Sequence, residues 1–261
     1  MQWATVRTVA ARDEIIAFLD ELLDARSFDD YGPNGLQVVG AGEVTTLVTG
    51  VSAHLELFEH AAAAGAQMVL CHHGILWNKQ PLAIDAQKRA RLEALFAADM
   101  SLAAYHLPLD AHPEVGNNAL ICAELGFERA EPFASMGGPP IGFVGRAREP
   151  VARAELLRRC REVFGGREPL AFEYGPDPVA SIGVVSGGGA SALIEAADLG
   201  LDAFVTGEPS EPGMADARER GITFVAGGHW ATETFGVRRL GELVAERFGV
   251  EHSFLAIENP A

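Results

Sequence analysis

The segment 45–74, TTLVTGVSAHLELFEHAAAAGAQMVLCHHG, decides the fold. It begins with a β-branched run, 45–52, which predicts a strand. The next stretch, 54–64, predicts a helix that Gly65 ends. A short apolar run, 67–71, then predicts a second strand. A strand, a helix and another strand in so short a segment are typical of the α/β class.

The same alternation continues along most of the chain, so we predict an α/β protein. The other expected helices are 13–24, 85–98, 117–125, 151–164, 190–199, 214–220 and 230–247. The other expected strands are 101–105, 141–144, 170–174, 181–185, 203–206, 222–226 and 253–257. Met136-Gly137-Gly138-Pro139-Pro140 indicates a linker or a boundary between lobes, because glycine and proline interrupt regular structure.

Composition excludes several classes of protein. The formal net charge is −16, with 36 acidic against 20 basic residues, which disfavours binding to nucleic acid. No apolar run reaches the roughly 18 residues that a membrane span needs. The N-terminus lacks the pattern of a signal peptide, and three cysteines without paired spacing argue against a disulfide framework. We therefore expect a cytoplasmic protein with no membrane partner.

Polar motifs follow two of the predicted strands. His72-His73-Gly74 comes directly after strand 67–71, and the motif 106–110 follows strand 101–105. Ligands bind at the carboxyl ends of strands in open α/β sheets. We therefore expect the two motifs to share one crevice.

A third motif lies near the end of the chain. In Gly227-Gly228-His229-Trp230-Ala231-Thr232-Glu233, a histidine and a glutamate stand four residues apart after an apolar run. If a helix begins there, both side chains lie on one face, one turn apart. An imidazole nitrogen and a carboxylate would then converge on one point.

Together these motifs predict a site for two divalent metal ions. The candidate ligands are His72, His73, Asp110, His229 and Glu233. Imidazole and carboxylate together suit zinc, manganese, iron or nickel better than calcium. Two-metal sites need a bridging oxygen ligand, and Glu233 is our candidate for it. We expect one ion on His73 and Asp110 and the other on His72 and His229, although each residue alone is commonplace.

Other residues have a functional and an ordinary interpretation. His106 could orient Asp110 or meet a substrate as a catalytic group, or be a buried histidine bonded at a strand end. Glu208 could face the crevice or lie at the surface. The motif 186–189, Ser-Gly-Gly-Gly, could cradle a phosphate, but a tight turn is the favoured interpretation. Cys71 is favoured as a small core residue.

The chain resembles the Nif-three-like dinuclear metal-centre hexameric proteins, often labelled type 2 GTP cyclohydrolase-like. The residues that carry the resemblance are Asn34-Gly35-Leu36-Gln37-Val38, Leu70-Cys71-His72-His73-Gly74, Tyr105-His106-Leu107-Pro108-Leu109-Asp110-Ala111-His112, Asn117-Asn118, Val205-Thr206-Gly207-Glu208, Gly227 to Glu233, and Ile257-Glu258-Asn259-Pro260-Ala261. One departure is Trp230, where many relatives have a histidine or another residue.

The resemblance implies two α/β lobes, the second inserted into the first, with the C-terminal helix and strand returning to the N-terminal lobe. We expect a metal-binding lobe of residues 1–130 plus 229–261 and an inserted lobe of 131–228. The resemblance also implies a homohexameric ring and two metal ions per chain on the same five ligands.

Two functions fit these predictions. The first is a metal-dependent hydrolase of a small, nucleotide-like substrate, similar to a GTP cyclohydrolase. The second is a non-catalytic, metal-binding ring that acts as a scaffold or binds a partner. A plain α/β domain with incidental histidines fits the convergence of the motifs less well. Acid or base groups beyond the ligands would favour the hydrolase, and His106 and Glu208 are the candidates.

Overall fold

The chain of this computed structural model, which describes residues 8–135 and 138–261, forms two units. The first unit comprises the chain up to Leu109 together with Val237–Ile257. The second comprises Asp110–Gly236 and Glu258–Ala261, so it is inserted in the chain of the first. Residues 1–7, on which the expected lack of a signal peptide rests, and residues 136–137 of the predicted linker lie outside the described residues.

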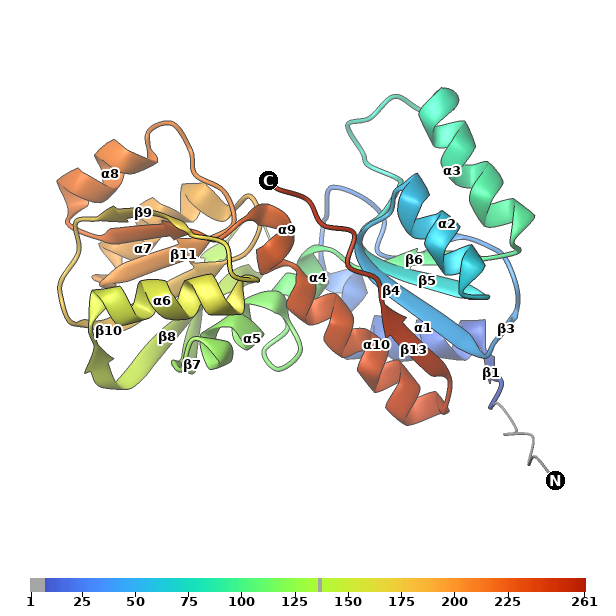
Figure 1. The fold of residues 1–261 in the computed structure, drawn as a ribbon, viewed down its shortest axis with the longest axis horizontal. Helices are drawn as coiled ribbons and strands as arrows, with labels where there is room; N and C mark the ends of the chain where they lie inside the picture. Colours follow the sequence, from blue (N-terminus) through green and yellow to red (C-terminus); the bar gives the residue numbers. More distant parts are fainter. Residues whose placement is uncertain (1–7, 136–137) are drawn as a thin grey trace. The chain divides into compact units, whose positions relative to one another are not determined.

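A five-stranded sheet in the order β13-β4-β5-β6-β2 forms the centre of the first unit (Figure 1). Its strands are β2 (Gly35–Val38), β4 (Thr46–Ser52), β5 (Met68–His73), β6 (Ser101–Ala104) and β13 (Glu251–Phe254). Neighbours among β13, β4, β5 and β6 are parallel, and β2 is an antiparallel edge. A separate ribbon pairs β1 (Ala10–Ala11) with β3 (Glu43–Val44). The C-terminal strand β13 lies in this sheet beside β4.

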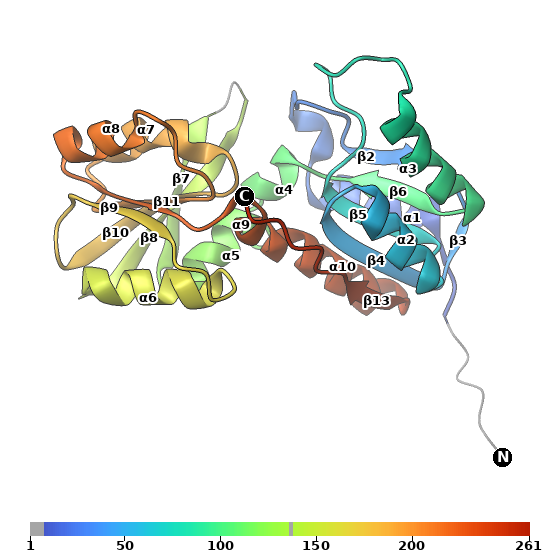
Figure 2. The same ribbon diagram turned by 45° about the horizontal axis from the view of Figure 1, so that its top comes forward.

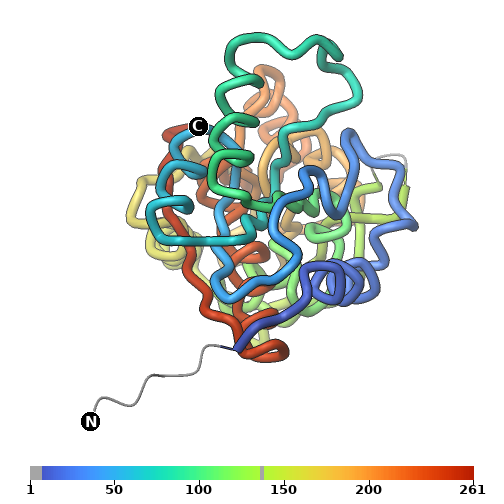
Figure 3. Tube along the Cα trace, turned by 90° about the vertical axis from the view of Figure 1, so that its right-hand side faces the viewer, coloured from blue at the N-terminus to red at the C-terminus, as the bar shows by residue number. Residues whose placement is uncertain are grey.

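Helices pack on both faces of this sheet (Figures 1 and 2). They are α1 (Arg12–Leu22), α2 (Leu55–Ala63), α3 (Ala86–Ala97) and α10 (Thr234–Phe248), with a 3-10 turn at Ala25–Ser27. Phe58 of α2 and Leu95 of α3 are fully buried in one core with the strand residue Val69. The α1 and α10 helices meet through Phe18 and Phe248, whose rings lie 5.8 Å apart. A long loop joins β5 to α3 (Figure 3).

The second unit is built on a six-stranded sheet in the order β7-β8-β10-β11-β12-β9. Its strands are β7 (Glu128–Ser135), β8 (Pro140–Val151), β9 (Leu170–Glu173), β10 (Val179–Val185), β11 (Ala203–Thr206) and β12 (Thr223–Ala226). Strands β10, β11 and β12 run parallel, so their carboxyl ends lie at one edge of the sheet. The other three pairings are antiparallel.

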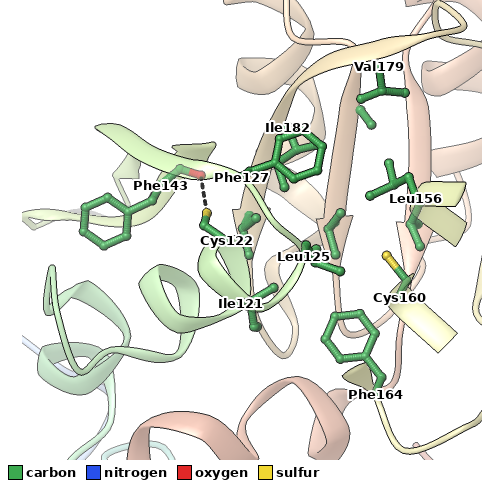
Figure 4. Packing of buried hydrophobic residues seen from close by; sticks show 14 of the residues in the cluster. Ile121, Cys122, Leu125, Phe127, Phe143, Leu156, Cys160, Phe164, Val179 and Ile182 are labelled. Atoms are coloured by element: carbon green, nitrogen blue, oxygen red, sulfur yellow. Dashed lines mark hydrogen bonds between the residues drawn. The ribbon is translucent and has the colours of Figure 1, made fainter. Parts of the chain in front are cut away.

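One face of this sheet carries the main core of the second unit (Figure 4). The helices of the unit are α5 (Asn117–Glu124), α6 (Arg153–Val163), α7 (Leu193–Asp198), α8 (Gly213–Arg220) and α9 (His229–Thr232), with a 3-10 turn at Gly189–Ala192. Ile121 of α5 and Leu156 of α6 are fully buried against Ile182 of β10. The α7 and α8 helices lie on the other face in Figures 1 and 2.

The boundaries between the two units lie at different residues from those expected. The sequence suggested 130/131 and 228/229, whereas the chain passes from one unit to the other at Leu109/Asp110, at Gly236/Val237 and at Ile257/Glu258. Packing explains the first difference, because α5 buries its apolar face in the second unit's core. The first two changes fall within helices, α4 (Leu107–Ala111) and α10, where the sequence shows no linker composition.

The composition shift that begins near Pro132 falls on two paired strands, and of the predicted linker 136–140 only Pro140 lies in a described strand. Strand β7 pairs with β8, and Ser135 lies opposite Pro140. Because β7 is an edge strand with a register shift between Arg129 and Pro132, it accommodates the proline. None of the helices in the described ranges 8–135 and 138–261 is long and apolar enough to cross a membrane.

Candidate metal centre

The first unit places both adjacent histidines within β5, where the sequence predicted that the strand ends at Cys71. The strand continues because Ser52 of β4 still pairs with His73. His72 is completely buried, whereas His73 is partly exposed. Their ring centroids lie 4.7 Å apart. Both rings therefore stand at the carboxyl end of β5, which is the edge where the sequence analysis expected a ligand.

Hydrogen bonds orient the two rings. Nδ1 of His72 lies 3.0 Å from the carbonyl oxygen of Tyr105, and Nδ1 of His73 lies 3.2 Å from Oγ of Ser52. A carbonyl oxygen can only accept, so Nδ1 of His72 carries the proton. In the neutral ring the lone pair is then on Nε2, which is the atom that can bind a metal ion.

His106 joins the same group of rings. It follows β6, and its centroid lies 5.0 Å from that of His72 and 5.4 Å from that of His73. Its Nδ1 lies 2.7 Å from Oδ1 of Asp30, which is almost fully buried. Burial alone would raise the pKa of Asp30. The hydrogen bond and the charge of His106, with bonds from Asn34 and Leu107, outweigh burial and lower it.

Two further side chains frame the histidine group. Trp77 meets His106 edge-on at 5.3 Å between centroids and donates from Nε1 to the carbonyl of Gly74. Gln37 of β2 accepts a bond from the backbone of Ile75 at 2.9 Å. The Gln37 amide fills the space where a Cβ of residue 74 would lie, so glycine at this position lets the amide approach the backbone.

In the second unit, three loops meet where β10, β11 and β12 end. They are 186–189, 207–208 and 227–233. Backbone bonds join them: Gly207 and Glu208 both donate to the carbonyl of Gly187, and Gly228 donates to that of Gly207. Two motifs of the sequence analysis, Ser-Gly-Gly-Gly and Thr206-Gly207-Glu208, thus lie beside the His229 loop.

His229 lies between two carboxylates. Its Nδ1 is 2.6 Å from Oε1 of Glu208, and its Nε2 is 3.1 Å from Oε1 of Glu233. The hydrogen bond to Glu233 is the main reason that the pKa of His229 rises to about 9, against the opposing effect of burial, and Glu208 adds to it. The predicted convergence of His229 and Glu233 is therefore present within this unit.

The predicted helix 230–247 is interrupted at the glutamate. Helix α9 ends at Thr232, and α10 begins at Thr234. Thr232 explains the break, because its hydroxyl donates to the carbonyls of Gly228 and His229 and accepts from the backbone of Gly187. Such local side-chain bonds compete with a continuous helix.

Gly187 allows the 186–189 turn to approach the ligand pair. Its φ is +58°, and a Cβ there would overlap Oε1 of Glu233 and lie 3.1 Å from Nε2 of His229. Glycine has neither the steric conflict nor the cost of positive φ. The motif serves here as a tight turn, which was the favoured interpretation.

Asp110 is held by a buried network. Its Oδ1 accepts bonds from Nδ2 of Asn117 at 2.8 Å and from Oγ of Ser186 at 3.1 Å. Asn117 in turn accepts from the backbone of Gly236. Asn118 accepts from the backbone of Ser186 at 2.6 Å and donates to Ile141. These bonds fix the rotation of the Asp110 carboxylate.

Each unit thus assembles part of the predicted ligand set. The first brings the candidate ligands His72 and His73 together with the catalytic candidate His106, and the three offer ring nitrogens within 4.8 Å of one another. In the second, His229 meets Glu233. Sequence reasoning missed Asp30, Ser186 and the role of Asn117. The adjacent asparagines 117–118 at a helix start were the available signal, whereas no local pattern marks Asp30.

The sequence profile of the Duf34/NIF3 family (NGG1p interacting factor 3) matches residues 10–260. The chain belongs to this family. Among relatives of this NIF3-family protein, one from Pseudomonas aeruginosa is 42% identical over 251 residues and one from Escherichia coli K12 is 42% identical over 250. These matches cover 96% and 95% of this chain and 99% and 98% of the relatives. Both relatives are named "GTP cyclohydrolase 1 type 2 homolog".

Solved structures of NIF3-family relatives have the same α/β fold. Protein ybgI, titled as of unknown function, is 40% identical with a TM-score of 0.91, over 97% of this chain and all of that one. TTHA1606 from Thermus thermophilus is 34% identical with a TM-score of 0.88, with the same coverage. The family resemblance and the α/β class inferred from the sequence are confirmed.

Proposed function

We propose that this NIF3-family protein binds two divalent transition-metal ions and uses them to hydrolyse a small, nucleotide-like molecule. The proposed ligands are His72, His73, Asp110, His229 and Glu233. Support comes from the ligand chemistry of each group and from the family resemblance. Zinc, iron, manganese and nickel all suit imidazole and carboxylate ligands.

The arrangement around His229 carries this proposal. Glu208 accepts a hydrogen bond from Nδ1, so Nε2 is directed to the side of Glu233. A carboxylate that orients a histidine from behind is the usual outer partner of a metal-binding imidazole. Nε2 of His229 and the carboxylate of Glu233 would be the two groups that hold a metal ion here.

Two metal ions in such a site polarise a substrate and lower the pKa of a bound water. The protein's own residues would position the ligands and limit the access of water. The Asn117–Ser186 network would hold Asp110 in position, and Trp77 would limit the access of water to the histidines. From the sequence, His106 remains a candidate for proton transfer. Hydrolysis at C8 of a purine is one reaction that this chemistry could support, as the names of the relatives suggest.

We also propose that six copies assemble into a ring and work in the cytoplasm. The assembly rests on the family resemblance. The reducing compartment agrees with three buried cysteines that form no disulfide. Light scattering after gel filtration should give a mass about six times the 27.7 kDa of the chain. A monomer at working concentration would contradict the ring.

Activity is tested with metal-loaded protein on GTP, other nucleotides and phosphate esters. Formate release from GTP reports attack at C8, and phosphate release reports ester hydrolysis. We expect the metal-loaded protein to turn over substrate, and we expect a chelator or the Glu233→Gln substitution to abolish this activity. Glu246→Gln, which changes an exposed residue of α10, should leave the activity unchanged. A protein that binds two ions but turns over none of these substrates would support the non-catalytic scaffold instead.

A further inference from the structure

Residues 258–261, here called the C-terminal segment, lie on the second unit, although the strand before them belongs to the first. The chain leaves the first unit at Ile257, and Glu258–Ala261 belong to the second. Figures 1 and 2 both show the end of the chain beside α9. All four residues are exposed, so burial of apolar surface does not hold them there. A small set of polar contacts holds the segment in place.

The sequence of the segment fixes its shape. Oδ1 of Asn259 accepts a hydrogen bond from the backbone N–H of Ala261 at 3.0 Å. Such a bond to the amide two residues further along is the turn that asparagine side chains favour. Pro260 has a fixed φ and restricts the residue before it to an extended backbone. The segment therefore loses little conformational entropy when it docks on the unit.

Arg167 holds the beginning of the segment. Its Nη1 donates to the carbonyl of Asn259 at 2.8 Å, and its Nη2 lies 3.3 Å from Oε2 of Glu258. The planar guanidinium makes such paired contacts in a fixed geometry, which the single ammonium of a lysine does not reproduce. Arg167 follows Gly165 and Gly166, both at a φ of +82°, which turn the chain after α6 ends. The end of α6 thus sets where the segment docks.

The other end of the segment meets the turn that carries His229. The carbonyl of Ala261 accepts a hydrogen bond from the backbone N–H of Trp230 at 3.3 Å. The same oxygen lies 3.7 Å from where a Cβ of residue 228 would be. Trp230 stands in the first turn of α9, where backbone N–H groups have no partner within the helix. The C-terminal segment supplies that partner.

The turn that the segment contacts has little stiffness of its own. It begins with Gly227 and Gly228, and the second has a φ of +103°. Glycine loses more conformational freedom on ordering than any other residue. The ring of Phe164 fills the space where a Cβ of residue 227 would lie. The end of α6 therefore holds the turn twice, directly through Phe164 and indirectly through Arg167 and the C-terminal segment.

We propose that the C-terminal segment holds the turn 228–230 in place, that Arg167 is the positioning residue, and that release of the segment frees the turn and the ring of His229. This rests on the proposed function only where His229 acts as a metal ligand. Because the contacts of the segment are few and exposed, it opens more easily than the sheet of the unit unfolds. The segment, rather than the global stability of the unit, then sets how often the turn opens.

Hydrogen–deuterium exchange of the full chain in chelator measures this opening without any metal. Arg167→Ala should raise the exchange rate of the peptide covering 228–233 by about 2–10-fold, the range expected for the loss of one hydrogen bond, and leave β10 and β11 unchanged. Arg220→Ala is the matched control, because both arginine side chains are 36% accessible and Arg220 pairs with Asp198 rather than with the segment. This control should change neither rate.

A shortened chain that ends at Ile257 shows whether Arg167 acts through the segment. Removing residues 258–261 should raise the exchange rate of the same peptide at least as much as Arg167→Ala does. Adding Arg167→Ala to the shortened chain should then have no further effect, because two changes that break one contact are not additive. A further increase would overturn the proposal, as would equal exchange rates in Arg167→Ala and Arg220→Ala.

The rate at which Zn²⁺ passes from the protein to a chelator tests the link to His229. If the ion leaves only when the turn opens, Arg167→Ala should speed its release by the same factor of about 2–10, and Arg220→Ala should not. Faster exchange with unchanged release would overturn the part of the proposal that concerns His229. A protein that binds no Zn²⁺ would contradict the proposed function, while the exchange experiment would still decide whether the segment holds the turn.

Discussion

Replacing Gly187 by alanine should weaken metal binding far more than it weakens the fold. The new methyl group would overlap Oε1 of Glu233 and lie 3.1 Å from Nε2 of His229. Because non-bonded carbon and oxygen atoms need more than about 3 Å, the Glu233 carboxylate would have to move by about 1 Å. Such a displacement separates the two proposed ligands.

The magnitude divides into two parts. Alanine at a φ of +58° costs about 1–2 kcal/mol in the free energy of unfolding, because its Cβ approaches the following carbonyl. In a protein of this size each kcal/mol lowers Tm by about 2–4 °C. Displacing Glu233 should reduce metal affinity by at least the factor of about 10–100 seen when an outer partner of a ligand is lost.

A matched control separates the two parts. Gly200 has a φ of +70° and nothing within 4 Å of where its Cβ would lie. Gly200→Ala should therefore lower Tm about as much as Gly187→Ala while metal affinity stays unchanged. Zn²⁺ titration by calorimetry, with thermal unfolding in chelator, measures both quantities. If Gly187→Ala binds Zn²⁺ as tightly as Gly200→Ala does, the reasoning about Glu233 and His229 is wrong.

Three further predictions concern other parts of the chain. Asn118→Ala should lower the free energy of unfolding by roughly 2–4 kcal/mol, because the buried backbone groups of Ser186 and Ile141 lose their hydrogen-bond partner. Chemical denaturation measures this change, and substitution of the exposed Asn259 by alanine should change the free energy of unfolding little. In chelator, the contribution of His229 to stability should be complete below about pH 6.5 and be lost as pH rises through about 9, because the folded-state pKa of His229 is raised to about 9. The loss should be at most about 3 kcal/mol, and His229→Gln should remove it. Burial raises the pKa of the thiols of Cys71, Cys122 and Cys160, the last two to about 12. The native protein should therefore react slowly with a thiol reagent, whereas the unfolded protein should react at all three cysteines. Fast labelling of the native protein would contradict the burial of these thiols.

Local pattern predicted most of the regular structure. The β-branched run 45–52 and the apolar run 67–71 correctly predicted strands β4 and β5, because a buried parallel strand needs continuous apolar residues. Strands β2 and β7 were missed since both lie at sheet edges, where half-exposed sequences carry polar residues and, in β7, a proline.

The candidate site was predicted to the extent that its residues are close in sequence or follow a strand. His229 and Glu233 converge across four residues, and their contact survives the break between α9 and α10. Asp30 was not predictable, because it lies 76 residues from His106 and only the fold brings them together. Two boundaries of the units, at Leu109/Asp110 and Gly236/Val237, were equally hidden, since they fall inside helices rather than in a linker.

Metal content tests the central claim most directly. The full chain is purified without added metal or chelator, and its transition metals are measured by elemental analysis per mole of protein. We predict close to two ions per chain, and a loss of metal in the His229→Ala/Glu233→Ala variant while the fold persists. Essentially no metal in the unaltered protein, even after reloading with zinc, iron, manganese or nickel, would contradict the account.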